Sequence, residues 1–329
     1  MGRLALRAAW DKPELEVVAI NEPSAGPHEL AHLLTFDSVQ GRWGHQAHGT
    51  EGSKGRGYLE ADQRRITTTQ ERNPADLPWR ELGVELVIEA SGAFRTRATL
   101  DRHLSAGASR VLVSCPVKDG PPNIVVGVNH LAYDLAKEPI VTAASCTTNC
   151  LAPVVRTLHD SVGIDRGLVT TIHNPTNTQV VTDAFHSDLR RARASQINLI
   201  PTSTNSATAV TMIIPELAGK LDSIAVRAPV LNASLTDCVF SMSRNTDIEE
   251  VNSCLRAAAS SGPLHGILGY EDRPLVSSDY VGDPRSGIVD ALSTRVTDHQ
   301  LVKVMVWYDN EWGYANRLAE LAVLMSEAT

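Results

Sequence analysis

The sequence predicts an α/β fold in two parts: a doubly wound parallel sheet, followed by an α+β region with a mostly antiparallel sheet. The chain has 329 residues, more than one hydrophobic core usually organises. Its first half alternates short apolar runs with helix-like segments, whereas its second half has longer runs in which apolar and polar residues alternate. We therefore expect one domain at residues 1–145, completed by a C-terminal helix at 310–329, and another at 146–309.

The first half contains the expected parallel strands, because strands that alternate with helices return to the same end of the sheet. The glycine-rich polar segment GRWGHQAHGTEGSKGRG, residues 41–57, predicts an exposed loop within this domain. The expected strands are 16–20, 85–89, 110–114, 124–128 and 140–143, and the expected helices are 3–10, 29–34 and 98–105.

The second half has runs of alternating character, which are typical of strands with one covered face. Two longer segments have the apolar spacing of helices. The expected strands are 167–172, 223–228, 235–242 and 301–308, and the expected helices are 248–259 and 311–325.

Composition excludes several classes of protein. Charged residues make up 21% of the chain and the formal net charge is −8, so no basic face for nucleic acid is expected. No segment approaches eighteen consecutive apolar residues, so we expect no membrane span. The odd number of cysteines at irregular spacing argues against a disulfide framework and for a cytoplasmic protein. The five are Cys115, Cys146, Cys150, Cys238 and Cys254.

The segment ASCTTNC, residues 144–150, lies between an expected strand and an apolar run at 151–158 that favours a helix. Cys146 is therefore expected at a strand-to-helix corner, where unpaired backbone N–H groups favour the thiolate and make the cysteine a candidate nucleophile. The alternative is a small buried hydrophobic residue, the commoner state of a free cysteine. Cys150 is one helical turn further and is interpreted as packing, because no neighbouring ligands complete a metal site.

His173 ends the expected strand at 167–172 and opens the polar loop NPTNTQ, residues 174–179. An imidazole in such a loop can reach a substrate and serve as a general base. The alternative is a loop histidine whose hydrogen bonds are satisfied within the protein. A cysteine nucleophile with a histidine base predicts covalent chemistry on an electrophilic carbon.

Ordered blocks along the chain resemble the glyceraldehyde-3-phosphate dehydrogenase family. They are ASCTTNCLAP, a strand that ends in histidine 27 positions after the cysteine, DLRRARA, IPTST, RAPVLNAS and WYDNEWGYANR. The resemblance implies that Cys146 attacks an aldehyde, that the thiohemiacetal gives a hydride to NAD, and that inorganic phosphate cleaves the thioester. It implies that His173 is the base, that glyceraldehyde 3-phosphate becomes 1,3-bisphosphoglycerate in glycolysis, and that the protein is a homotetramer.

The resemblance also implies two anion pockets, and hydroxyl and guanidinium groups suit phosphate oxygens. Two departures predict weaker phosphate binding: Ser187 replaces a frequent lysine, and Asn205 replaces a usual glycine. The implied pocket for the substrate phosphate is Thr176, Thr178 and Arg227, and that for the attacking phosphate is Ser145, Thr147 and Thr204, with Arg191 between them.

A carboxylate for the cofactor follows the first expected strand. Glu22 lies about twenty residues after Gly2, where a dinucleotide fold places the acid that bonds the adenosine ribose. It would repel a 2′-phosphate, so NAD is expected rather than NADP, although the family more often has aspartate. By resemblance, the other cofactor residues are Gly2, Arg3, Arg72, Ser91 and Gly92, with Asn310 and Tyr314 near the nicotinamide.

The start of the sequence departs from the family, which begins with an apolar strand and a G-x-G-R-x-G turn. This sequence begins at the last glycine of that turn, as Met1-Gly2-Arg3, so about ten residues are expected upstream. We interpret Met1 as a misassigned start. The strand concerned is central in the sheet, so its loss is expected to leave two strands without a partner and the pyrophosphate cradle incomplete.

Several alternatives remain open. DAFHSDLRRARA is similar to an erythrose-4-phosphate dehydrogenase branch, although Thr176 and Thr178 keep the glyceraldehyde-3-phosphate pattern. HNPTNTQ and LNASLTDC are similar to a branch encoded beside arsenic-resistance genes, which implies arsenate in place of phosphate and a 1-arseno product. A non-phosphorylating aldehyde dehydrogenase and a folded family member without catalysis are the remaining readings.

Overall fold

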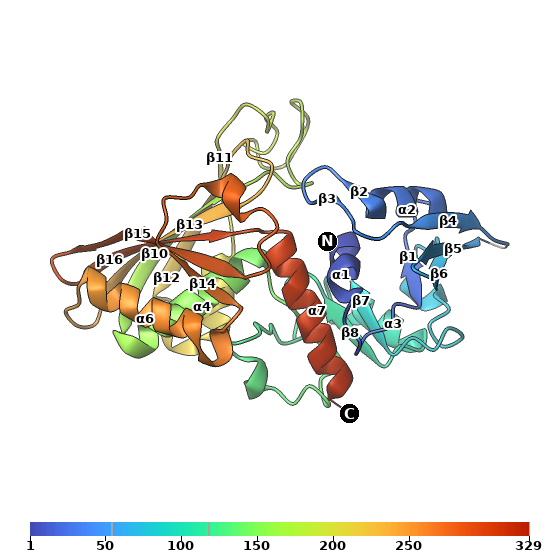
Figure 1. The fold of residues 1–329 in the computed structure, drawn as a ribbon, viewed down its shortest axis with the longest axis horizontal. Helices are drawn as coiled ribbons and strands as arrows, with labels where there is room; N and C mark the ends of the chain where they lie inside the picture. The colour runs from blue at the N-terminus through green and yellow to red at the C-terminus, as the bar shows by residue number, and fades with distance from the viewer. Residues whose placement is uncertain (54, 118, 329) are drawn as a thin grey trace. The chain divides into compact units, whose positions relative to one another are not determined.

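The computed structural model describes residues 1–53, 55–117 and 119–328 and divides them into two compact units (Figure 1). The first unit comprises Met1–Asn123, Ala132–Ala144 and Ala315–Thr329, and the second comprises Ile124–Leu131 and Ser145–Tyr314. Lys54 of the expected loop and Thr329 of the expected C-terminal segment lie outside the described residues. No described helix is both long enough and apolar enough to cross a membrane.

The first unit has short strands in three small sheets, with helices between them. One sheet has the order β1-β6-β5-β4, a second has the order β7-β8-β9, and β2 pairs with β3. The helices are α1 (Gly2–Ala9), α2 (Pro27–Thr35) and α3 (Arg97–Ser105). The strands are β1 (Ala19–Asn21), β2 (Phe36–Asp37), β3 (Gly41–Arg42), β4 (His48–Glu51), β5 (Arg56–Ala61), β6 (Arg64–Thr69), β7 (Leu86–Glu89), β8 (Arg110–Val113) and β9 (Ile140–Thr142).

The doubly wound parallel arrangement is present, but its sheet is in two pieces. β1 runs parallel to β6, and β7, β8 and β9 run parallel to one another. Among the described residues, β1 pairs only with β6 and β7 only with β8, so each has one open edge. Side chains still connect the pieces, because Ala19 of β1 packs against the cluster that contains Val87 of β7.

Three expectations for the first half were wrong or incomplete. The expected loop at 41–57 contains β3, β4 and the start of β5. Alternation along β5 and β6 buries Leu59 and Ile66, a pattern that the glycines nearby obscured. The apolar run at 124–128 is not a strand: it enters a turn in which Gly127 has a φ of 85°, and it belongs to the second unit.

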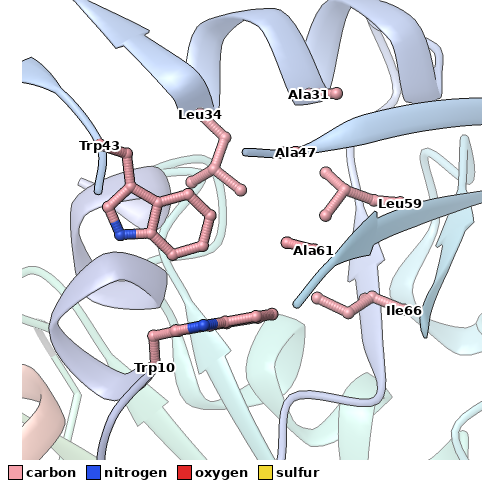
Figure 2. Packing of buried hydrophobic residues seen from close by; sticks show 8 residues of the cluster. All are labelled: Trp10, Ala31, Leu34, Trp43, Ala47, Leu59, Ala61 and Ile66. Carbon is pink, nitrogen blue, oxygen red and sulfur yellow. The ribbon is translucent and has the colours of Figure 1, made fainter. Parts of the chain in front are cut away.

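A hydrophobic core joins α2 to the β4-β5-β6 part of the first unit (Figure 2). The rings of Trp10 and Trp43 meet edge to face, with centroids 5.1 Å apart. Gly49 of β4 allows α2 to approach, since a Cβ there would lie 2.2 Å from the carbonyl oxygen of Pro27. The buried members of this core are Trp10, Ala31, Leu34, Trp43, Ala47, Leu59, Ala61 and Ile66.

The second unit is built on a seven-stranded sheet of order β11-β12-β10-β13-β16-β15-β14. It is mostly antiparallel, as expected, with parallel pairing of β10 with β12 and of β14 with β15. Its strands are β10 (Ile164–His173), β11 (Ile200–Ser203), β12 (Leu221–Arg227), β13 (Ser234–Met242), β14 (Leu268–Glu271), β15 (Gly287–Thr297) and β16 (Leu301–Tyr308). Its helices are α4 (Cys146–Ser161), α5 (Ser206–Ile213) and α6 (Ile248–Ser260). Helix α7 (Trp312–Glu327) begins in this unit.

Burial alternates along the central strands of this sheet. Along β13, Cys238 and Phe240 are fully buried, whereas Val239 between them is only half-buried. Helices α4, α5 and α6 pack on the sheet and cover one face. The open face carries exposed apolar side chains, among them Leu168 and Ile172 of β10.

Candidate active site

Cys146 is the first residue of α4, four positions after β9 ends, so the predicted strand-to-helix corner is confirmed. Ser145 caps the helix, because its hydroxyl oxygen accepts a hydrogen bond of 3.1 Å from the Thr148 N–H. Burial raises the pKa of the Cys146 thiol, and the N–H groups of Cys146 and Thr147, which bond the sulfur, oppose this rise. The sulfur therefore lies at a helix end that stabilises negative charge.

His173 lies within reach of this sulfur. It ends β10, as predicted, and its Nε2 atom is 3.7 Å from Cys146 Sγ. The histidine is buried, with 5% of its surface exposed. A cysteine and a histidine in this relation form a nucleophile and its base.

The Nδ1 atom of His173 has two neighbours of opposite character. It lies 2.8 Å from the carbonyl oxygen of Asn174, which can only accept, and 2.6 Å from the Arg227 Nη1 atom, which can only donate. Arg227 Nη1 also donates to the same carbonyl at 3.0 Å, so the imidazole has a cation beside it. The form of the ring with its proton on Nδ1 has a lone pair on Nε2 facing Cys146, and this form can take a proton from the sulfur.

Burial and charge keep this pair neutral. Burial, together with the charge of Arg227, lowers the pKa of His173 to about 4. Burial also raises the pKa of the Cys146 thiol, although Thr147 and Arg227 oppose the change. The thiolate expected from the helix end is thus wrong for this state, because desolvation outweighs the helix-end amides. The pair is arranged for proton transfer from sulfur to Nε2 as the sulfur attacks.

Two arginines approach the pair. Burial lowers the pKa of Arg227, and the charge of Arg191 lowers it further, so the two cations lie within electrostatic range. Arg191 donates from Nε to Thr202 Oγ1 at 2.7 Å and from Nη2 to the Ser203 carbonyl at 3.4 Å, next to Thr204. Cations held near one another in a partly buried site favour an anionic ligand.

The hydroxyl residues form separate small groups. Thr176 and Thr178 have hydroxyl oxygens 2.9 Å apart, and Gln179 Oε1 accepts from the Thr176 N–H at 2.9 Å. Thr204 Oγ1 lies 2.6 Å from Ser206 Oγ. Ser145 and Thr147 lie beside Cys146 at the start of α4, the first as its N-cap and the second within it. In the described part of the chain, no hydrogen bond joins Thr176, Thr178 or Thr204 to the cysteine.

Comparisons with known proteins give the family of this site. Residues 145–310 match the family described as glyceraldehyde 3-phosphate dehydrogenase, C-terminal domain, and residues 1–97 match its NAD binding domain. The chain belongs to the glyceraldehyde-3-phosphate dehydrogenase family. A protein of that name from a Nostoc species is 57% identical over 98% of this chain and 94% of its own length. One from Bacillus subtilis is 46% identical over 99% of this chain and 96% of its own length. One from Geobacillus stearothermophilus is 45% identical over 99% of this chain and 95% of its own length.

In this family the first unit carries the NAD-binding domain, and its residues fit a dinucleotide. A Cβ on Gly2 would meet Ala90 at 3.5 Å, so the N-terminus of α1 lies beside the carboxyl end of β7. Glu22 and Arg72 follow β1 and β6, which are parallel neighbours, so both lie at one edge of their sheet. The carboxyl ends of parallel strands and a helix N-terminus are where such folds hold nucleotides.

The side chains of two expected cofactor residues make contacts within the protein. Arg3 forms an ion pair of 3.7 Å with Asp37. The Ser91 hydroxyl donates to Glu89 and accepts from the Ala93 N–H, so a nucleotide contact at Ser91 is left to its backbone and remaining lone pair. Gly92 has a φ of 68°, a left-handed conformation that glycine adopts without strain.

Sequence reasoning missed two residues that organise the second unit. The Tyr308 hydroxyl lies 3.0 Å from Thr147 Oγ1, and its ring meets His173 edge to face at 6.0 Å. Ser234 donates to Asn310 Oδ1 at 2.9 Å and so orients that amide. Asn310 and Tyr314 are both buried in the second unit. The motif WYDNEW and the block RAPVLNAS contain these residues, but periodicity alone assigns them to strand packing.

Proposed function

We propose that this chain oxidises glyceraldehyde 3-phosphate with NAD and inorganic phosphate, forming 1,3-bisphosphoglycerate. The observation that carries the proposal is the placement of Cys146 Sγ 3.7 Å from His173 Nε2 at the start of α4, in a chain of this family. The proposal assigns residues 1–145 with 310–329 to cofactor binding and residues 146–309 to the chemistry.

The chemistry proceeds through a thioester. Cys146 Sγ bonds to the aldehyde carbon while its proton passes to His173 Nε2, and the new oxyanion takes this proton from His173 to give the thiohemiacetal and a neutral imidazole. NAD, when bound, supplies the hydride acceptor. His173 takes the hydroxyl proton as the C–H bond of the thiohemiacetal carbon gives up its hydride. Phosphate oxygen then bonds to the acyl carbon as the C–S bond breaks, and the proton on His173 returns to the departing sulfur.

Phosphate recognition is proposed to use the two arginines with the hydroxyl groups. Arg227 Nε and Asn174 Oδ1 are buried without a hydrogen-bond partner, which leaves capacity for a polar ligand. A substrate phosphate at Arg227 would offset the charge beside His173 and make the imidazole a stronger base. The proposed substrate pocket is Thr176, Thr178 and Arg227, and the proposed acceptor pocket is Ser145, Thr147, Thr204 and Arg191.

The test is NADH formation from glyceraldehyde 3-phosphate with varied inorganic phosphate. We expect saturable dependence on both, and product that contains an acyl phosphate. Phosphate-independent formation of 3-phosphoglycerate would replace the proposal with a non-phosphorylating reaction. Two further assays replace glyceraldehyde 3-phosphate with erythrose 4-phosphate and inorganic phosphate with arsenate, because pockets of this chemistry accept both compounds. A higher kcat/KM for erythrose 4-phosphate would reassign the substrate, and a clear preference for arsenate would favour the arsenic-linked branch.

The proposed assembly is a homotetramer. Supporting it, the open face of the seven-stranded sheet carries exposed apolar side chains, which rarely stay in water when they are contiguous. All five cysteines are free, which supports a reducing, cytoplasmic setting. Sedimentation equilibrium checks the assembly, and a monomer at micromolar concentration contradicts it. The exposed residues are Leu168, Ile172, Ile224, Leu292 and Leu301.

A further inference from the structure

Strand β7, labelled in Figure 1, ends at Glu89, whose carboxylate is buried. Glu89 is 6% exposed, and its Oε1 accepts from the Ser91 N–H at 2.7 Å and from the Ser91 hydroxyl. Its other oxygen, Oε2, lies 3.2 Å from His103 Nε2. The carboxylate is thus held between a turn on one side and a helix on the other.

The proton on His103 is fixed by Trp79. The indole Nε1–H of Trp79 lies 3.1 Å from His103 Nδ1, and an indole can only donate. Nδ1 is therefore the acceptor, and the ring proton is on Nε2, where it is donated to Glu89. The ring is also enclosed, since the Trp79 ring lies beside it at an angle of 20° with centroids 6.4 Å apart, and Phe94 meets it edge to face.

These contacts keep Glu89 charged inside the protein. Burial would raise its pKa, but the hydrogen bonds from His103 and Ser91 outweigh burial and lower the pKa. A buried ionised carboxylate contributes little to stability compared with an apolar pair of the same volume. Its effect is geometric: it fixes the backbone amide and the hydroxyl of Ser91, and Arg95 Nε donates to the Gly92 carbonyl at 2.7 Å from the other side.

We propose that Glu89, held by His103 and Trp79, is a positioning residue for NAD binding that fixes the Ser91–Gly92 turn at the carboxyl end of β7. The turn lies after a parallel strand, the edge at which doubly wound sheets bind nucleotides. It also follows Ala90, which lies beside the N-terminus of α1. The proposal rests on the proposed function, because NAD is its ligand.

A matched pair of variants at His103 tests the role. His103→Gln keeps an N–H donor near the position of Nε2, whereas His103→Leu has a similar size and removes it. We expect His103→Leu to raise the dissociation constant of NAD about tenfold, the worth of one hydrogen bond to a charged group, and His103→Gln to retain most of the affinity. The control is Thr96→Ala, which removes the N-cap of α3 without touching the network and is expected to leave NAD binding unchanged.

The dissociation constants are measured by calorimetric titration with NAD, alongside KM for NAD, KM for the aldehyde and kcat. The proposal requires the change to lie in the two NAD constants, with the KM for the aldehyde unmoved. Equal NAD affinity in His103→Leu and the parent overturns it. Equal weakening in His103→Leu and Thr96→Ala also overturns it, because the effect would then come from a looser α3.

Glu89→Gln provides a second variant if His103→Leu does not fold. The amide has the size of the carboxylate, but in either orientation it places an N–H against the His103 Nε2–H or against the Ser91 N–H. We expect about tenfold weaker NAD binding. Parent-like affinity in this variant contradicts the proposal. Failure of the proposed function is distinguishable, because the parent protein itself would then neither bind NAD nor form NADH.

Discussion

The two units of the chain hold their functional residues in different ways. In the second unit His173 ends β10, a strand that is paired on one side with β12 and on the other with β13. In the first unit β1 and β7 each have a partner on one side only within the described residues, and three of the residues assigned to NAD follow these strands in turns, namely Glu22, Ser91 and Gly92. Hydrogen bonding on both sides gives a site high local stability, whereas turns after open-edged strands depend on side-chain contacts.

This difference suggests that cysteine chemistry and cofactor binding respond separately to mutation. The Cys146–His173 pair needs α4, β10 and their neighbours, which all belong to the second unit. The Ser91–Gly92 turn needs Glu89 and His103, which belong to the first. Variants in one unit should therefore leave the other unit's measurable property intact.

The largest effect is expected for Cys146→Ser. A serine hydroxyl stays protonated beside a neutral imidazole, so kcat should fall by about ten-thousandfold or more, as for other lost nucleophiles. NAD affinity, measured by titration, and the thermal unfolding midpoint should remain those of the parent. Turnover within tenfold of the parent would remove Cys146 from the mechanism, and loss of NAD affinity would break the separation of the units.

Replacement of His173 by asparagine should slow the reaction by about a hundredfold to ten-thousandfold, the usual worth of a positioned base. The amide can keep a hydrogen bond to the sulfur but cannot take its proton. Stopped-flow measurement of the first turnover isolates this step, and alkylation of Cys146 reports whether the thiol remains accessible. A change of only a few-fold would show that another group is the base.

His173 should also make stability depend on pH. Its pKa is lowered from 6.5 to about 4 in the folded protein, so between these values the unfolded chain binds a proton that the folded chain does not. The free energy of unfolding should therefore fall as the pH falls, by about 2 kcal/mol from about pH 7 to about pH 5. Urea unfolding of the parent and of His173→Asn at both pH values measures it. If the free energy of unfolding falls by the same amount between the two pH values in both proteins, the lowered pKa of His173 is contradicted.

The sequence predicted the catalytic corner well because its signals are local. An apolar strand, the small residues Ala144 and Ser145, and a helical run place Cys146 at the start of α4. The chain order alone could not give the distance from the sulfur to His173. That distance depends on the position of β10 in the sheet. The resemblance implied that the two residues act together, and the structure gives the distance.

The sequence predicted charge states poorly, because desolvation is a property of the packed protein. A helix end suggests a thiolate, but burial raises the pKa of Cys146 and lowers that of His173. The same limit applies to Glu89 and His103. They are 14 positions apart, in a strand and a helix with no motif between them, and only packing brings them together.

The open edges of β1 and β7 allow a test of whether strand pairing in the first unit limits NAD binding. A variant extended before Gly2 by about ten residues, carrying an apolar strand and a G-x-G turn, should pair with these edges and add N–H donors for a pyrophosphate. NAD affinity should rise about tenfold or more, the worth of a single hydrogen bond to a charged group. The rate of Cys146 alkylation should not change, since the second unit is unaffected. Equal NAD affinity with and without the extension would show that these edges do not limit cofactor binding.

The smallest effect is expected at Glu22, which acts on cofactor choice rather than on affinity. Its backbone N–H bonds the Thr69 carbonyl at 3.0 Å, and its carboxylate accepts from the Ser24 N–H at 3.0 Å, so the side chain is held where β1 ends. A carboxylate there bonds ribose hydroxyls and repels a 2′-phosphate. Because Glu22 is only half-buried, solvent screens the repulsion, and Glu22→Ser should lower the ratio of kcat/KM for NAD to that for NADP by about tenfold. Glu22→Gln is the matched control, because it keeps the size and removes the charge. If Glu22→Gln keeps the parent ratio while Glu22→Ser loses it, hydrogen bonding and not charge selects NAD, and if both keep it, the selecting residue lies elsewhere in the first unit.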